Sequence, residues 1–409
     1  MFAKKYFERY QCLPPTFKPN ANQNLGIVVV IPCYDDDDVL NTIVSLERAD
    51  KPNVDVEVIV VLNSAEDTER NIVEKHRAIY AELKRLGDEN VFKNFRLLPI
   101  LLEDIPNKIS GVGYARKAGM DEAVRHFDDI DNKQGVLVSL DSDCRVAKSY
   151  FTVIQSLFID GNSDVATLGF EHKTHDEEQV NDRNLLEARE AACRKYELYL
   201  RYFRLSLQST GFLYAIHTIG SCFAINAGTY VKTGGMPRLK GGEDFYFLHK
   251  AAQIAPITRV NDKIVCPSSR MSERVPFGTG RAITKIMDTD VYRVYSFGSF
   301  AVLRDFFYLI PQFFKHIDLN TIPSAIIDFY GSEQLMKKLN EIRNNSNGLS
   351  AFTKRFFATF DAFFAIRLLN YIADYEDITI CAKELLSYYN QPYTEELSDI
   401  YHQIDVLDT

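Results

Sequence analysis

The sequence contains no tryptophan, only seven cysteines, and no long uninterrupted apolar run. No two cysteines are spaced as C-x-x-C, which argues against a disulfide framework and favours reduced thiols in a cytoplasmic protein. The aromatic-rich stretches 299–314 and 351–371 are both interrupted by charged residues, so neither reaches the about 18 apolar residues of a membrane span. We therefore expect no transmembrane segment. Helix packing explains these stretches better than peripheral contact with a membrane, although that contact stays open.

An excess of positive charge is also missing. The chain has 47 basic and 56 acidic residues, a net charge of −9. A general nucleic-acid binder needs an electropositive footprint, so we expect no nucleic-acid partner. A small anionic ligand held by a few cations or by a metal remains compatible with this balance. The first 19 residues include no apolar core of a signal peptide, so none is expected.

Two nucleotide-binding motifs and a zinc site are missing as well. No G-x-x-x-x-G-K-[ST] occurs, which excludes a P-loop. The segment 107–123 offers G-x-G, but Arg116 stands where a dinucleotide fingerprint needs its third glycine. His172 and His175 are three residues apart without a third zinc ligand nearby. We therefore expect neither a Rossmann cofactor nor structural zinc.

Apolar runs and helical patterns alternate in the first half of the chain. Strands are expected at 25–34, 54–63, 95–102 and 135–141, each rich in Val, Ile or Leu and each followed by a helix. Such alternation is typical of βαβ units, which predicts an α/β fold with a mainly parallel central sheet between helical layers.

The same pattern suggests an organisation into domains. We expect an N-terminal extension at 1–24 and a catalytic domain at 25–294. This domain would consist of a nucleotide-binding half, 25–145, and an acceptor half, 146–294. From 295 to 409 the sequence is helical and rich in aromatic residues, which predicts a C-terminal helical region.

The segment GVLVSLDSDC places Asp141 and Asp143 after the fourth expected strand. In an extended chain, residues two apart point to the same side, so these carboxylates could share a cation. Mg²⁺ and Mn²⁺ favour such ligands together with substrate phosphates. The alternative is a helix N-cap formed by Ser142 or Asp143. Because ligands bind beyond the carboxyl ends of parallel strands, the metal site is the favoured interpretation.

Three further clusters carry functional and ordinary interpretations side by side. In IPCYDDDDVL, Pro32 and Tyr34 could line a flat nucleobase pocket, while two of the four aspartates suit a helix N-terminus. In GGEDF, Glu243 and Asp244 form either a helix cap or a carboxylate base. Near 270–281 a basic loop could close over phosphates or be an ordinary turn. Its candidate diphosphate-binding residues are Arg274, Gly278 and Arg281.

In order, VVVIPCYDDDDVL, VIVVLNS, GVGYARKAG, VSLDSDC and GGEDF resemble family 2 glycosyltransferases of the GT-A fold, over about residues 26–247. The resemblance implies that Asp143 binds a divalent metal, Mn²⁺ or Mg²⁺, with Asp141 on the ribose side or at the metal. It implies that Asp244, beside Glu243, is the general base. The implied nucleotide-sugar-binding residues are Pro32, Tyr34, Asp35, Asp36, Asn63, Ala115, Arg116, Lys117, Asp141 and Ser142, with Gly119 completing the A-R-K-x-G segment.

The sequence also departs from the family pattern. Leu62-Asn63 replaces the usual acidic pair or Asp-Asn at the second strand end, and Lys117 replaces the usual Asn. No histidine follows in 250–295 to add a metal ligand.

The resemblance implies an inverting transferase that moves a sugar from a UDP- or GDP-linked donor to a hydroxyl of a carbohydrate or lipid-linked acceptor. The alternatives are a nucleotidyltransferase that makes a sugar-nucleotide and a catalytically silent nucleotide-binding module. The sequence lacks the glycine-rich basic loop expected of a nucleotidyltransferase after the first strand. A silent module is suggested by Leu62 and Lys117, which depart from the family pattern.

Overall fold

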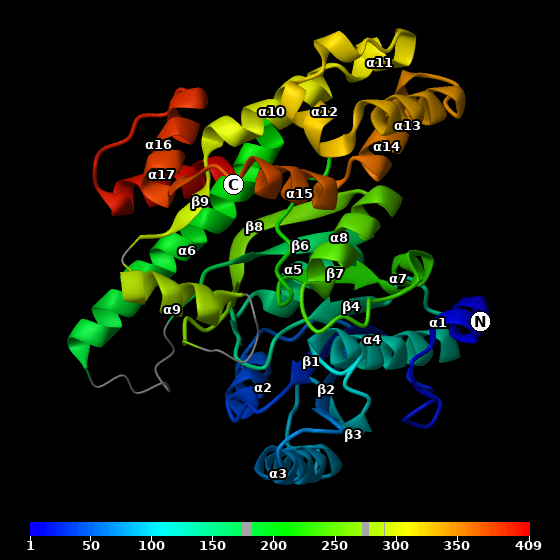
Figure 1. Ribbon diagram of the computed structural model, residues 1–409. Coiled ribbons are helices and arrows are strands. Elements are labelled where there is room, and N and C mark those ends of the chain that lie inside the picture. The colour runs from blue at the N-terminus through cyan, green and yellow to red at the C-terminus, as the bar shows by residue number, and fades with distance from the viewer. Residues whose placement is uncertain (174–181, 272–277, 290) are drawn as a thin grey trace. The chain divides into compact units, whose positions relative to one another are not determined.

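A computed structural model describes residues 1–173, 182–271, 278–289 and 291–409 (Figure 1). The chain divides into two compact units. The first unit comprises residues 1–177 and 218–268, and the second comprises 178–217 and 269–409. The predicted domain boundaries at residues 24 and 294 stay a prediction.

The first unit is built on a large mixed sheet. Its described strands are β1 (Leu25–Cys33), β2 (Asp55–Ala65), β3 (Arg96–Ile105), β4 (Val136–Ser139), β5 (Arg145–Val146), β6 (Val165–Phe170), β7 (Phe223–Asn226) and β8 (Ile257–Cys266). They lie in the order β3-β2-β1-β4-β7-β6-β8-β5. The pairs β3–β2, β2–β1, β1–β4 and β6–β8 are parallel, whereas β4–β7, β7–β6 and β8–β5 are antiparallel. The predicted α/β fold with a mainly parallel sheet is confirmed.

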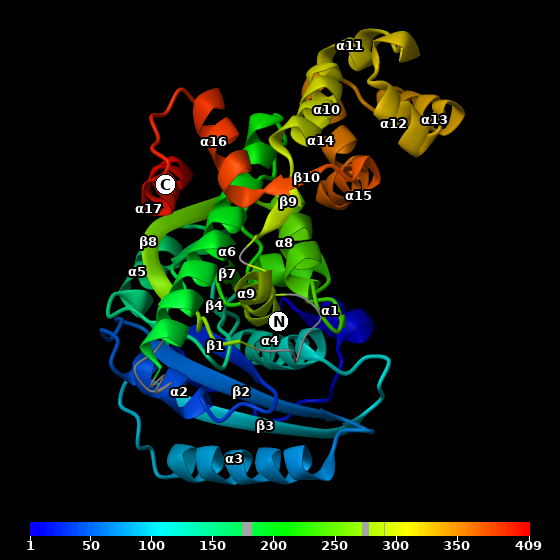
Figure 2. The ribbon, with the colours of Figure 1, turned by 60° about the vertical axis from the view of Figure 1, so that its left-hand side comes forward.

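Helices cover both faces of this sheet. The helices of the first unit are α1 (Lys4–Tyr10), α2 (Val39–Glu47), α3 (Arg70–Asp88), α4 (Val112–Asp129), α5 (Tyr150–Phe158), α7 (Ala227–Thr233) and α8 (Glu243–Ile254). The connections from β1 to β2 to β3 run in one direction across the sheet, and the one from β3 to β4 runs back. Since such crossovers are right-handed, α3 and α4 lie on opposite faces (Figure 2).

The direction of the chain across the sheet reverses between β1 and β4. Both strands are buried along their whole length, as expected for Val- and Ile-rich strands covered on both faces. They pair in parallel from Ile27–Val136 to Val30–Ser139, so their carboxyl ends lie side by side. Ligands of open α/β sheets bind at such a switch point. The loops that follow β1 and β4 are therefore the expected place of a ligand site.

Helix α4 is buried on nearly all sides. A Cβ added to Gly119 would lie 2.5 Å from a Val30 methyl and 3.0 Å from a Val61 methyl, so this glycine lets the helix pack closely on β1 and β2. The N-terminal segment covers another side of α4. There the Tyr6 hydroxyl donates to Asp121 at 2.6 Å, and the Ala3 amide donates to Asp128 at 2.9 Å.

The second unit is mostly helical. It contains α6 (Arg183–Ser209), α9 (Thr279–Thr289), α10 (Phe297–Tyr308), α11 (Ile310–Lys315), the 3-10 helix η2 (Leu319–Thr321), α12 (Ser324–Tyr330), α13 (Ser332–Asn344), α14 (Leu349–Thr359), α15 (Ala362–Ile372), α16 (Ile378–Tyr388) and α17 (Leu397–Asp408). A short antiparallel pair joins β9 (Arg293–Tyr295) to β10 (Tyr375–Asp377).

Aromatic packing accounts for the two Phe-rich stretches of the second unit. Phe306 contacts Phe356 and Phe360 with ring centroids 5.4 and 5.2 Å apart, and all three side chains are buried. Among the described residues, no helix is both long and apolar enough to cross a membrane. Helix packing is therefore the interpretation that the structure favours for these stretches.

Helices α6 and α17 are joined by buried polar contacts. Arg201 on α6 donates to Asp405 at 2.7 Å, and the Tyr401 hydroxyl donates to Glu197 at 2.6 Å. Asp408 bonds both Arg204 and His217, the latter at 2.8 Å. His217 belongs to this network. Each of these contacts joins positions about 200 residues apart.

Candidate active site

The loops after β1 and β4 are bonded to each other at the switch point. The Ser142 hydroxyl donates to Asp36 Oδ2 at 2.7 Å, and the Thr42 hydroxyl donates to the Ser142 carbonyl at 2.7 Å. Asp36 and Ser142 are both buried. These two predicted nucleotide-binding residues therefore hold the two loops together. Their positions in the sequence alone did not indicate this role.

Asp141 and Asp143 lie on a turn that leads from β4 to β5. Residues 142 and 143 form the turn, and the Cys144 amide donates to the Asp141 carbonyl at 3.3 Å. The assumption of an extended chain at these residues is thus wrong. The N-cap alternative is wrong as well, because α5 begins after Ser149. Both aspartates remain half-buried at the carboxyl end of the sheet.

Arg116 connects the turn after β4 to the start of α8. Its guanidinium donates to Asp141 Oδ1 at 2.7 Å and also to Glu243 Oε1. Arg116 and Glu243 have side-chain exposures of 2% and 3%, whereas Asp141 is 39% exposed. The bridge therefore joins a buried carboxylate to one that solvent and ligands can reach. Among the described residues, Arg116 Nε is buried without a hydrogen-bond partner.

Asp244 lies beside this bridge in the first turn of α8. Its Oδ1 accepts a hydrogen bond of 2.8 Å from the Phe245 amide. Burial raises the pKa of Asp244 above its usual 3.8, while the Arg116 guanidinium opposes the rise. A carboxylate whose pKa lies above its ordinary value holds a proton more readily, which suits a general base.

Gly220 is a residue of this site that the sequence did not reveal. A Cβ at this position would lie 2.8 Å from Arg116 Nη2 and 3.2 Å from Asp244 Oδ2. The absent side chain therefore leaves room for the guanidinium and the carboxylate to lie near each other. The only signal in the sequence was a glycine shortly before the apolar run CFAI.

Tyr34 and Asp35, two of the predicted nucleotide-sugar-binding residues, contact His76 of α3. Tyr34 is 41% exposed and contacts the His76 ring edge-to-face at 5.5 Å. The Asp35 amide donates to His76 Nε2 at 2.9 Å, and Asp35 has a left-handed φ of 46°. On the other side of the ring, Nδ1 lies 2.8 Å from the Ser64 hydroxyl. His76 thus holds the loop that presents Tyr34.

This arrangement predicts acid sensitivity. Burial lowers the pKa of His76 below its usual 6.5. In addition, Nε2 can accept the hydrogen bond from the Asp35 amide only while it is unprotonated. As pH falls below about 6.5, the unfolded chain takes up a proton that the folded chain does not, so stability is lost until the folded pKa is reached. We expect His76→Gln to remove part of this loss, with a slope of at most about 1.4 kcal/mol per pH unit.

Urea unfolding of the wild type and of His76→Gln between pH 7.5 and 5 checks this prediction. The exposed His402 offers a matched control, because His402→Gln should leave the wild-type pH dependence unchanged. Identical pH dependences for the wild type and His76→Gln would refute the role assigned to His76.

The remaining aspartates of the DDDD run are held by cations. Lys75 bonds Asp35 at 2.9 Å and Asp37 at 2.7 Å. Arg145 donates two hydrogen bonds to Asp38, the residue before α2, at 2.8 and 3.0 Å. The run is therefore mainly a structural element that fixes the β1–α2 loop.

Asn63 joins two parts of the candidate site. It is buried near the end of β2, and its amide donates to the Gly111 carbonyl, immediately before α4, at 3.3 Å. Pro32 and Ala115 are also buried, in β1 and α4. These three residues are therefore buried parts of the sheet and of α4 and are not exposed to a ligand.

Lys117 does not belong to this cluster, and two other predicted residues belong to the second unit. Lys117 lies in a separate buried group, where its ammonium bonds Tyr6 at 2.9 Å and Asp121 at 3.1 Å. Gly278 precedes α9 and Arg281 lies within it, both in the second unit. Arg274 lies outside the described residues.

The donor set of the D-x-D turn fits a divalent cation that arrives with phosphates. Asp141 and Asp143 offer carboxylate oxygens, the ligands that Mg²⁺ and Mn²⁺ favour. In the part of the chain that the structure describes, no three His, Cys, Asp or Glu side chains are grouped as a metal site. Mg²⁺ is often held by one or two carboxylates together with substrate phosphates, which this set could provide.

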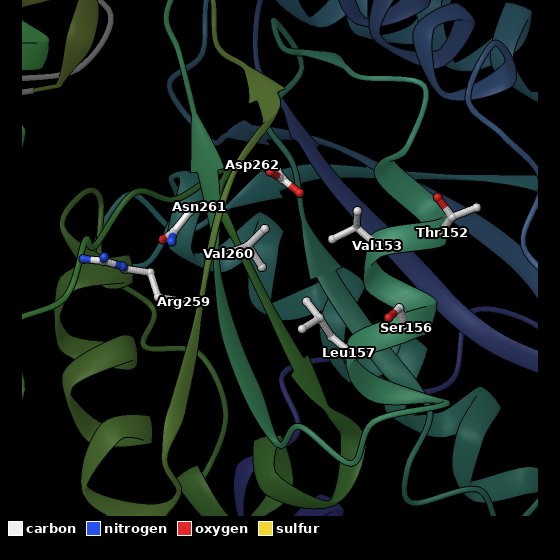
Figure 3. Close-up of a pocket in the computed structure, with 8 residues that line it drawn as sticks. All are labelled: Thr152, Val153, Ser156, Leu157, Arg259, Val260, Asn261 and Asp262. Atoms are coloured by element: carbon white, nitrogen blue, oxygen red, sulfur yellow. The ribbon is translucent and has the colours of Figure 1, made fainter. Parts of the chain in front are cut away.

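A cavity of 490 Å³ lies elsewhere on the first unit, between α5 and β8 (Figure 3). Its lining includes Thr152 and Ser156 of α5 and Asp262 of β8. None of the predicted site residues lines it, so it plays no part in the candidate site.

No protein-family model and no curated protein sequence matches the chain. Solved structures give weak similarity. The crystal structure of residues 1–349 of TarS from S. aureus in complex with UDP-GlcNAc has 16% identity and a TM-score of 0.41, covering 90% of this chain and 93% of that one. The mannosyltransferase PcManGT from Pyrobaculum calidifontis, in complex with GDP-Man and Mn²⁺, has 14% identity and a TM-score of 0.35, covering 99% and 92%.

Proposed function

We propose that this protein is an inverting, metal-assisted glycosyltransferase of the GT-A fold that uses a UDP- or GDP-linked sugar. One observation carries the proposal. At the switch point of the sheet, buried Arg116 bridges Asp141 of the D-x-D turn and Glu243, and Asp244 lies beside the bridge. This arrangement supports the proposal, because a cation, carboxylates suited to a metal and a candidate base lie near the carboxyl ends of β1 and β4.

In the proposed reaction, Asp244 accepts the proton of the acceptor hydroxyl as its oxygen attacks the anomeric carbon. A bond forms between that oxygen and the carbon while the bond from the carbon to the diphosphate oxygen breaks. The products are the inverted glycoside and the nucleoside diphosphate, and Asp244 then releases its proton to solvent. The neighbouring carboxylates of Glu243 and Asp141 are both bonded to Arg116, so Asp244 is the one assigned as base, and direct displacement is the mechanism that we propose.

The remaining residues bind and orient the donor. Tyr34 presents an exposed ring for a nucleobase, while Asp36 and Ser142 keep the two strand-end loops together. Asp143, with Asp141, would hold the divalent metal, which when bound neutralises charge on the leaving diphosphate. Arg116 supplies a fixed positive charge at the same place.

Asp143→Ala should abolish metal-dependent nucleotide binding, because it removes the carboxylate assigned to the metal. Calorimetric titration with UDP and with GDP, each with Mn²⁺ and with EDTA, measures this. The control is Asp67→Ala, because Asp67 is exposed and its carboxylate has no hydrogen bond or ion pair with the described residues. Metal-independent binding of equal affinity in all three proteins would contradict the assignment.

A panel of nucleotide-sugars incubated with Mn²⁺ tests the proposal as a whole. Slow release of sugar from one UDP- or GDP-linked donor, with an inverted product, supports a transferase. Exchange of pyrophosphate would instead indicate a nucleotidyltransferase, and an inert chain that binds nucleotide would indicate a silent module. The proposed setting is the cytoplasm, with a carbohydrate or lipid-linked acceptor.

A further inference from the structure

A second cavity, of 460 Å³, lies in the first unit away from the Arg116 bridge. It is formed by the end of α1, helix α4, the loop before α8 and α8 itself. Its lining residues are Arg9, Tyr10, Gln11, Lys117, Gly234, Gly235, Met236, Pro237, Arg238, Tyr246, Phe247 and Lys250. Neither Asp141 nor Asp244 belongs to this lining, so the cavity is distinct from the proposed active site.

The lining contains four cations and no carboxylate. Lys117 is already paired with Asp121. Arg9, Arg238 and Lys250 are exposed, and across the described parts of the chain none of the three has an ion-pair partner. The protein as a whole has a net charge of −9, so a cavity lined by three such cations differs in sign from the chain's overall charge. Their mutual repulsion would be relieved by a bound anion.

Local structure explains only one of these charges. Arg9 lies in the last turn of α1, where the helix dipole favours a cation. Arg238 lies in the loop before α8, and Lys250 is not in the last turn of α8, so neither has this reason. Three separate elements therefore each bring a cation to one cavity, and a bound anion would stabilise this arrangement.

The backbone wall of the cavity is a pair of glycines. Gly234 and Gly235 have φ values of 78° and 80°, which side-chain-bearing residues rarely adopt. A Cβ on Gly235 would lie 2.1 Å from the Tyr6 hydroxyl and 2.8 Å from Lys117 Nζ. A side chain on Gly235 would therefore displace the Tyr6–Lys117 contact. A Cβ on Gly234 would lie 3.6 Å from Lys250 Nζ and from Tyr10 Cζ, so this glycine lets the backbone lie close to two residues of the lining.

Two tyrosines complete the lining. Tyr10 and Tyr246 are 48% and 42% exposed, and each offers an apolar ring with a polar tip. Such rings beside cations suit a ligand that combines an anionic group with a less polar body. We propose that the cavity binds a phosphate-bearing ligand, either a sugar phosphate or a polyphosphate, through Arg9, Arg238 and Lys250. This inference goes beyond the proposed function and does not depend on it.

The test compares the wild type with the triple variant Arg9→Gln, Arg238→Gln, Lys250→Gln. A matched control, Lys51→Gln, Lys133→Gln, Lys148→Gln, removes three exposed charges of the same unit that lie outside the cavity. Binding of tripolyphosphate, glucose 6-phosphate, inorganic phosphate and glucose is measured by calorimetry at 50 and 200 mM salt. Since the altered side chains are exposed, thermal melting should show all three proteins folded.

We expect the wild type and the control to bind a phosphate compound, more weakly at high salt, and the cavity variant to lose at least about tenfold in affinity. Glucose 6-phosphate binding more tightly than inorganic phosphate, with no binding of glucose, would identify a sugar phosphate. Preference for tripolyphosphate would identify a polyphosphate. Equal affinities in the cavity variant and the control would overturn the proposal, whatever the outcome of the transferase assays.

Discussion

Replacement of Asp244 by asparagine is expected to lower turnover by roughly 10²–10⁴-fold, the usual contribution of a general base. The amide cannot accept the acceptor proton, while Arg116, Asp141 and Glu243 keep their contacts. Donor binding should therefore change little. Initial rates of sugar transfer and calorimetric donor titration separate the two effects.

Stability should not fall in this variant. Because burial raises the pKa of Asp244, its charge costs folding free energy at neutral pH, and asparagine removes that cost. In the wild type, turnover should decline as pH falls through the raised pKa, since protonated Asp244 is no base. Asp67→Asn is the matched control, and unchanged transfer rates in Asp244→Asn would eliminate Asp244 as the base.

Replacement of Arg116 by methionine should be strongly destabilising, by about 3–5 kcal/mol, because it leaves Glu243 buried without its cation. Methionine keeps much of the side-chain length, so the loss reports mainly the missing charge. Urea unfolding at pH 7.5 measures the change. Addition of Glu243→Gln should recover part of the stability, because the double variant contains no unpaired buried carboxylate there.

Arg70 gives the contrasting control. It pairs with Glu74 on α3 at 2.8 Å, but its side chain is 91% exposed. Arg70→Met should cost at most about 1 kcal/mol, as is usual for surface pairs. Similar losses for Arg116→Met and Arg70→Met would mean that the Arg116 bridge does not hold α4, the turn after β4 and α8 together.

The sequence was most informative where burial is uniform. The predicted strands at 25–34, 54–63, 95–102 and 135–141 correspond to β1–β4, because continuous Val, Ile and Leu runs indicate strands covered on both faces. Strand β8 was not predicted. Most of its residues are half-buried or exposed, so it lacks an apolar run.

The site was less accessible from sequence because its key contacts are long-range. Arg116 and Glu243 are 127 residues apart, and no local pattern indicates that they pair. The motif at 115–119 also gave no sign that Arg116 and Lys117 would lie in separate clusters. Adjacent helical residues point about 100° apart, so one can join the candidate site while the other joins the N-terminal segment. His76 was also missed, because it lies in a charged helix and its contact with Asp35 joins positions 41 residues apart.

The contacts between α6 and α17 have a consequence for biosynthesis. Arg201, Arg204 and Glu197 are made about 200 residues before their partners on α17. At typical synthesis rates of 5–20 residues per second, this interval is about 10–40 s. During that time the charged side chains of α6 have no α17 to bury them. The second unit should therefore reach its final packing only after α17 has left the ribosome, while β1–β4 can pair much earlier.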